Sequence, residues 1–162
     1  MDSTTIERRQ GAARATMQKL CTQLGWRGES VMVDGDLVYQ IPLPEDPDVC
    51  GAFFIVEAEE PSIIRLYLTL PMNAAPAQIA EASEFVVRCG YGRKFGTLEL
   101  NMERGSLRVR VETDVMDGAL DECVARLLDR AMALGRAVSP GWRAMVSKKP
   151  KAAEAIDGRA DG

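Results

Sequence analysis

The sequence lacks the side chains and loops on which many enzymes depend. It has no histidine among its 162 residues, so Cys50 and Cys89 have no imidazole to activate them as nucleophiles. A glycine-rich stretch at 90–92 follows an expected helix and precedes an expected strand, which is the reverse of the order in a phosphate-binding loop. We therefore do not expect an enzyme, and we expect no catalytic residue and no cofactor.

The sequence also has no recognisable metal motif. The cysteines lie far apart on apolar positions of expected elements, at Cys21, Cys50, Cys89 and Cys123. We interpret them as reduced core residues, not as disulfide partners or zinc ligands. Acidic residues gather where the last helix should begin, at Asp114, Asp117, Asp121 and Glu122. The helix dipole explains acids in a first turn, and the spacing does not match a calcium loop, so we expect no metal.

Long apolar runs and a secretory signal are missing as well. No apolar run approaches the length that spans a bilayer, and residues 1–9 lack the basic-then-apolar order of a signal peptide. The chain is 46% apolar and 27% charged, as in ordinary globular proteins. We expect a cytoplasmic protein with no membrane partner. It should form one domain over 1–146, followed by a disordered tail over 147–162.

Positive charge is also in short supply. The net charge is −4 and the isoelectric point is near 5.0, which argues against nucleic acid as a partner. Several basic residues could still be gathered into an anion-binding surface: Arg65, Arg93, Lys94, Arg104, Arg108 and Arg110. We favour a solvated strand face on which arginines pair with Glu99 and Glu112 across the strands.

Apolar residues recur at helical spacing in three stretches. The expected helices cover 4–24, 79–89 and 117–138. Thr4 with Glu7 three residues later forms a capping-box pattern at the start of the first, and Asp117 is placed to cap the last. Pro140 lacks an N–H and clashes with a preceding turn, so we expect residues 139–141 to break or redirect the last helix. Ser139 and Pro140 could then start a short extra helix that carries Trp142.

The remaining apolar stretches predict strands. They cover 31–33, 36–43, 50–59, 63–70, 97–102 and 107–112. Asp34-Gly35 is a hairpin signal between the first two, and the loops up to residue 70 are too short for crossovers. The fold class is therefore α+β, with a mainly antiparallel five-stranded sheet in α-β-β-β-α-β-β-α order. The segment 31–33 is a possible extra N-terminal hairpin strand, and the helices should pack mostly on one face.

One face of this sheet should be apolar on its earlier strands and polar on its later ones. The candidate residues for a partner surface share this face: Val38, Phe53, Ile55, Ile63 and Tyr67. An exposed apolar patch on a soluble protein normally marks an interaction site. Alternatively, the chain covers the patch itself with its first helix or with the segment around Trp142.

The order of elements resembles the type III secretion chaperone-like fold and, within it, the YbjN-like bacterial family. The resemblance runs from about Thr16 to Val138. Its local echoes are Phe53-Phe54-Ile55-Val56, then Ile64-Arg65-Leu66-Tyr67-Leu68, then Phe95-Gly96-Thr97-Leu98-Glu99-Leu100 and Gly105-Ser106-Leu107-Arg108-Val109-Arg110-Val111. The resemblance implies a small acidic protein, often dimeric, that binds another polypeptide and has no chemistry of its own.

Patterning and resemblance together favour a non-enzymatic protein-binding module of the chaperone, adaptor or regulatory kind. The partner would be a protein held on sheet and helix surface. We also expect a homodimer, formed through the outer side of the second helix near Phe85 and Tyr91. The alternative function is a domain that binds a small molecule, with a nucleic-acid surface as the weaker choice.

Overall fold

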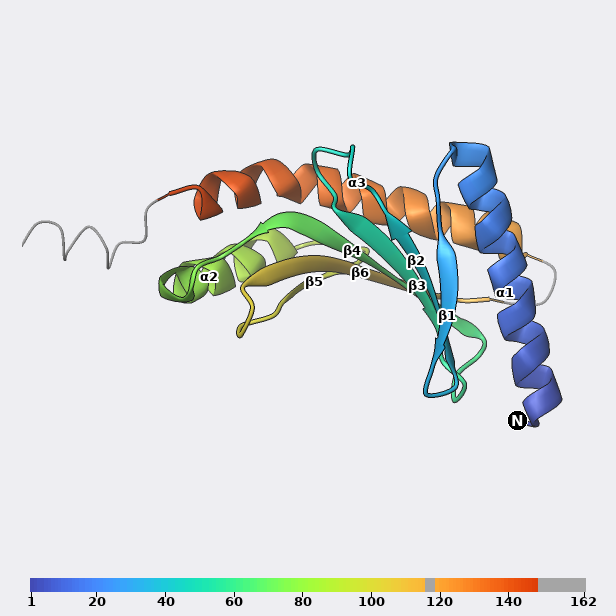
Figure 1. Ribbon diagram of the computed structural model, residues 1–162. Helices are drawn as coiled ribbons and strands as arrows, with labels where there is room; N and C mark the ends of the chain where they lie inside the picture. The colour runs from blue at the N-terminus through green and yellow to red at the C-terminus, as the bar shows by residue number, and fades with distance from the viewer. Residues whose placement is uncertain (116–118, 149–162) are drawn as a thin grey trace, which may run out of the picture.

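Six strands form one antiparallel sheet in the order β1-β2-β3-β4-β6-β5. The computed structural model describes residues 1–115 and 119–148 (Figure 1). The helices are α1 (Ser3–Leu24), α2 (Ile79–Gly90) and α3 (Leu120–Val146), with a 3₁₀ turn η1 (Pro76–Gln78) before α2. The strands are β1 (Glu29–Val33), β2 (Asp36–Pro42), β3 (Gly51–Val56), β4 (Ile63–Asn73), β5 (Thr97–Leu100) and β6 (Ser106–Asp114). The predicted α+β class is confirmed, and the possible hairpin strand is present as β1.

The two faces of the sheet differ because side chains alternate along each strand. On β3 and β4 every second residue is buried, from Ala52 to Val56 and from Ile64 to Leu70. We call this side the inner face. Helix α3 packs against it over β4 and β6, α1 packs beside β2, and α2 lies against β5 (Figure 1). We call the other side the open face, because no helix of the described residues packs on it.

The last helix does not break at Pro140 as expected. It runs without interruption from Leu120 to Val146. Trp142, which is fully buried, donates from Nε1 to the carbonyl oxygens of Pro71 and Met72 at 3.1 and 3.2 Å. This anchoring, together with the burial of the indole, offsets the missing N–H and the steric cost of the proline.

The buried amide of Gln78 ties the end of α3 to the turn before α2. Its Nε2 donates to the carbonyl oxygens of Met145, Val146 and Lys148 at 3.0–3.3 Å, and its Oε1 accepts from the Ala75 N–H at 2.9 Å. The last carbonyls of a helix have no partner within the helix. Gln78 supplies that partner, which fixes α2 relative to α3.

Helix α1 begins two residues after the N-terminus and not at the expected capping box. The Asp2 carboxylate accepts from the Thr5 N–H at 2.7 Å, so Asp2 is the cap in place of Thr4.

Hydrogen bonds from Lys19 and Thr16 hold the pKa of Asp121 below its usual value and join α1 to the first turn of α3. The predicted cap Asp117 and the tail from residue 149 lie outside the described residues.

The hairpin between β1 and β2 forms at the predicted Asp34-Gly35 turn. Both residues have positive φ, 51° and 91°, as a two-residue type I′ turn requires. Gln10 of α1 donates from Nε2 to the Gly35 and Val56 carbonyl oxygens at 2.9 and 3.1 Å. These bonds fix α1 over the β2–β3 end of the inner face.

Two glycine-to-alanine substitutions should change stability in opposite directions. Gly105 has φ +70°, and a Cβ there would lie 2.0 Å from the Ala74 carbonyl oxygen. We expect Gly105→Ala to lower the free energy of unfolding by about 3 kcal/mol. Gly11 lies within α1 with no atom within 4 Å of its added Cβ, so Gly11→Ala should raise it by about 0.5 kcal/mol through helix propensity. Urea denaturation measures both, and equal stability of the two variants would contradict the close approach at Gly105.

Candidate functional site: the open face of the sheet

Cross-strand pairing arranges the open face in three rows. The first row reads Val31, Val38, Ile55, Arg65 and Glu112 from β1 to β6. The second reads Gln40, Phe53, Tyr67, Arg110 and Thr97 from β2 to β5. The third reads Pro42, Gly51, Thr69, Arg108 and Glu99. The face is therefore apolar over β1–β3 and charged over β6 and β5, with β4 between the two halves.

The apolar half contains one contiguous cluster of side chains. The rings of Phe53 and Tyr67 lie 6.0 Å apart between centroids and are tilted by 40°, within the range of favourable aromatic pairs. Ile55 and Val38 are half-buried neighbours in the adjoining row, and Val31 at the edge is 45% exposed. These five residues are called the apolar cluster below.

Arg108 orders the border between the two halves. Its guanidinium carbon lies 4.1 Å from the centre of the Tyr67 ring, in position for a cation–π contact. The same guanidinium makes hydrogen bonds and an ion pair with Glu99 at 2.6–2.7 Å. The Tyr67 ring is thus held between Phe53 and Arg108, which gives the apolar cluster a fixed shape.

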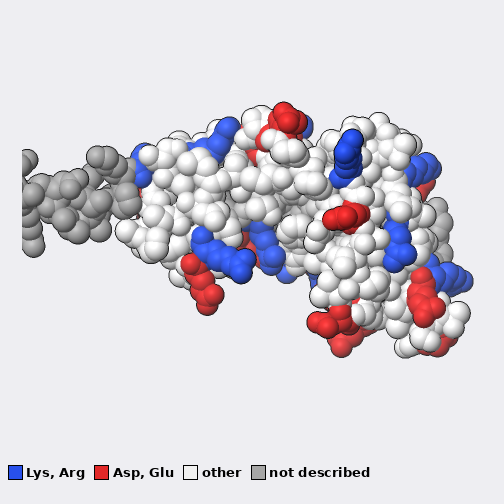
Figure 2. Space-filling view, viewed as in Figure 1, with Lys and Arg blue, Asp and Glu red and all other residues white. Residues whose placement is uncertain are grey.

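The charged half is internally neutralised. Arg65, which is 20% exposed, pairs with Glu57, with Glu60 at 3.0 Å and with Glu112 at 3.0 Å. Hydrogen bonds to Glu57 and Glu112 raise the pKa of the Arg65 guanidinium, so it stays charged. Arg110 shares Glu99 with Arg108. The expected cross-strand pairing is present, and Figure 2 shows acidic and basic side chains interspersed on the side in view.

A hollow of 300 Å³ lies beside Phe53 on the open face. Gly51 lacks a side chain and Pro42 is short, so the third row leaves space next to the Phe53 ring. Glu29 and Gln40 form its polar rim. A single apolar side chain from another molecule fits this chemistry, with polar groups at the rim to meet its backbone.

The structure brings together four of the five predicted partner-surface residues: Val38, Phe53, Ile55 and Tyr67. Ile63 shares the open face but pairs with Asp114 at the far end of β4, where Arg65 and its carboxylates separate it from the others. Sequence reasoning missed Val31. The two-residue turn at 34–35 places Val31 opposite Val38, so counting back from the turn would have found it.

The two predicted dimer residues occupy different environments. Phe85 on α2 is half-buried, and its ring lies 5.8 Å from the indole of Trp142. Tyr91, directly after α2, is 93% exposed. Phe85 is therefore engaged within the chain, and Tyr91 is the one of the pair that presents its ring to solvent.

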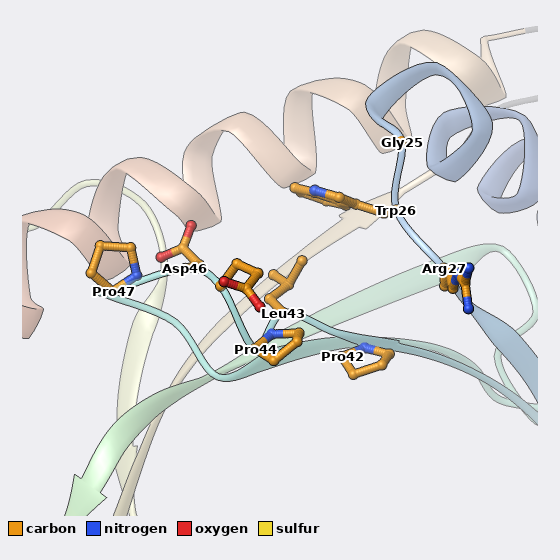
Figure 3. A pocket seen from close by; sticks show the side chains of 9 residues that line it. Gly25, Trp26, Arg27, Pro42, Leu43, Pro44, Asp46 and Pro47 are labelled. Atoms are coloured by element: carbon orange, nitrogen blue, oxygen red, sulfur yellow. The ribbon is translucent and has the colours of Figure 1, made fainter.

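A second hollow, of 520 Å³, lies between the end of α1 and the loop after β2 (Figure 3). The half-buried Trp26 faces Leu43 and the prolines of this loop, and Arg27 lies at the far end (Figure 3). Asp46 is occupied within the loop, because its Oδ1 accepts from the N–H groups of Asp48 and Val49 at 2.9 and 3.1 Å. The hollow is an apolar cleft with an aromatic wall.

Side chains that could ligate a metal are dispersed within residues 1–115 and 119–148. That part of the chain holds no cluster of three or more acidic or sulfur ligands suited to a metal ion. Burial raises the pKa of the Cys21 thiol and of Tyr39 beside it, so both stay protonated at neutral pH. None of the described helices is long and apolar enough to cross a membrane.

Comparison of the chain with known proteins returns no match. No protein-family model, no curated protein and no solved structure is similar to it at a significant level.

Adjacent residues on β4 test whether the open face is surface or core. Leu66 is fully buried on the inner face, and Tyr67 is half-buried on the open face. We expect Leu66→Ala to lower the free energy of unfolding by about 3 kcal/mol, as for a buried leucine. Tyr67→Ala should cost about 1 kcal/mol, because only its contacts with Phe53 and Arg108 are lost. Equal losses in urea denaturation would mean that the apolar cluster is core.

Proposed function

We propose that the chain is a non-enzymatic protein-binding module, of the chaperone or adaptor kind, that holds a polypeptide segment on the open face. The observation that carries the proposal is the apolar cluster on β1–β4, which no element of the described residues covers. Its ring pair is held in place by Arg108 and adjoins a hollow of 300 Å³. A preformed site of this kind loses little conformational freedom when a partner binds.

The chemistry of the partner follows from the site. The backbone N–H and C=O groups of the inner strands are already paired with neighbouring strands in the plane of the sheet. Recognition on the open face therefore uses side chains. An apolar side chain would enter the hollow beside Phe53, with neighbours resting on Ile55 and Val38. Covering on the order of 300 Å² of apolar surface would contribute about 7 kcal/mol before the costs of association. A favourable free energy of this size, reduced by the costs of association, suits a reversible client or adaptor contact.

We also propose a cytoplasmic location and a family relationship for this binding module. A cytoplasmic location is consistent with free cysteines, of which Cys50 is exposed. A relationship to the YbjN-like family and the type III secretion chaperone-like fold is also part of the proposal. It is supported by the element order, which is helix, four strands, helix, two strands, helix, and which matches the expected order once β1 is counted as the extra hairpin strand.

A photo-crosslinking amino acid tests the proposal directly. With p-benzoylphenylalanine in place of Phe53, irradiation in a native lysate should crosslink a discrete polypeptide, because this side chain borders the hollow. The control places the same residue at Val87 on α2, which is 73% exposed but lies away from the open face. Adding Tyr67→Asp to the Phe53 variant should abolish the crosslink while circular dichroism stays unchanged. Indistinguishable products from positions 53 and 87 would contradict the proposal.

The cleft at Trp26 supports a second candidate function, the binding of a small molecule. Trp26 lines the cleft and Trp142 is fully buried elsewhere, so the two indoles can be told apart by quenching. If the cleft is a ligand site, a metabolite that raises the melting temperature should also change Trp26 fluorescence. Trp26→Phe should remove that signal. Thermal shifts that survive Trp26→Phe would exclude the cleft.

A further inference from the structure

β1 is an edge strand without the usual protection against pairing. Proline, lysine and a bulge are common devices that block an edge, and Glu29 to Val33 contains none of them. Its one charged residue, Glu29, is the first residue of the strand. Val31, Met32 and Val33 are 45–49% exposed. Helix α1 reaches this strand on the inner face, where the Arg14 guanidinium lies 3.7 Å from the Met32 Sδ. The opposite edge strand β5 has four residues, and α2 packs against it.

The turn geometry determines which backbone groups of β1 point outward. In a two-residue hairpin the residues next to the turn, here Val33 and Asp36, form a hydrogen-bonded pair. Hydrogen-bonded and non-hydrogen-bonded pairs alternate from there, so Val33, Val31 and Glu29 bond to β2. The N–H and C=O groups of Ser30 and Met32 therefore point away from the sheet.

We propose that β1 pairs antiparallel with β1 of a second copy of this chain, about a two-fold axis at Val31. In this register Ser30 of each copy lies opposite Met32 of the other. The outward N–H and C=O groups of both residues are then satisfied by four intermolecular hydrogen bonds. The two sheets join into one continuous sheet, and this inference does not rest on the proposed function.

Side chains favour this register. Val31 meets Val31 of the second copy in a non-hydrogen-bonded pair, where side chains are closest. The row Ile55, Val38, Val31 is thereby continued by the same row in reverse, so the apolar clusters of the two copies become one. The register centred on Val31 places Glu29 opposite Val33 of the second copy and keeps the two Glu29 carboxylates about four residues apart along the strands. A register centred on Ser30 would bring these two carboxylates to diagonal positions.

Charges at the ends of the pairing are complementary. Centring on Val31 brings residues 27 and 28 of one copy beside the 34–35 turn of the other. Arg27 and Asp34 are both exposed, and the two-fold axis forms this Arg27–Asp34 contact twice. The second copy is therefore a better occupant of this edge than an unrelated strand, because β1 is complementary to itself in one register.

Residue 31 is the one side chain that meets its own equivalent, which gives a charge test. We expect the wild type to dimerise in analytical ultracentrifugation at about 100 µM, as a small interface would. Val31→Lys and Val31→Glu should each weaken dimerisation at least tenfold, because like charges meet at the axis. An equimolar mixture of the two should restore a dimer. Val87→Lys on α2 is the control and should dimerise as the wild type does.

A cysteine pair fixes the register. In a Cys50→Ser background, which removes the exposed thiol, oxidised Val31→Cys should run as a disulfide-linked dimer. Val33→Cys should not, because its equivalents lie about four residues apart along the strands, beyond the ~7 Å that a disulfide spans. A monomeric wild type, or a mixture that stays monomeric, would overturn the dimer. Crosslinking through Ser30→Cys in place of Val31→Cys would overturn the register. Both readouts are independent of crosslinking at Phe53.

Discussion

The packing of α3 across the inner face is the contact on which the rest of the structure depends. Gly135 faces the sheet, where a Cβ would lie in ordinary van der Waals contact, 3.4–3.7 Å from side chains of Val49, Leu68 and Leu70. Trp142 then anchors the C-terminal half to β4 through two carbonyl oxygens, and Gln78 closes the final turn. One long helix thus covers the middle of a six-stranded sheet, and the two shorter helices complete the coverage at its ends.

Because the helices cover only the inner face, the side chains of the open face must find their partners among themselves. The β6–β5 half does so with ion pairs: three carboxylates surround Arg65, and Glu99 serves both Arg108 and Arg110. Ion pairs at this exposure contribute little to stability, but they leave no unpaired charge for an anionic ligand. The apolar side chains of the β1–β3 half cannot be stabilised by ion pairs. They lower the free energy only when they are removed from water. The apolar cluster is therefore the part of the open face that would gain most free energy from being covered by a partner.

The sequence predicted what alternation and turn chemistry determine. Period-two patterns identified the inner face, and Asp34-Gly35 predicted the hairpin that joins β1 to β2. Four of the five partner-surface residues lie together because strand order and register follow from short antiparallel connections. What it could not predict depended on tertiary contacts. Pro140 stays within α3 because the Trp142 anchor lies two residues further along the helix. Ile63 is set apart by the carboxylates that gather around Arg65. The hollow beside Gly51 is a property of three neighbouring strands and has no local signal.

The open face and the β1 edge offer two orthogonal directions of association. Pairing at the edge uses backbone groups in the plane of the sheet, and binding on the face uses side chains perpendicular to it. The two proposed contacts therefore do not compete, although Val31 takes part in both the apolar cluster and the strand pair. Joining two copies at Val31 would place two hollows on one continuous face, so a segment held by one copy would meet the cluster of the other. A bivalent surface binds a repeated or extended apolar segment more tightly than either half alone, because the second contact is intramolecular. Self-pairing at an otherwise unprotected edge would thus also strengthen the recognition proposed for the face.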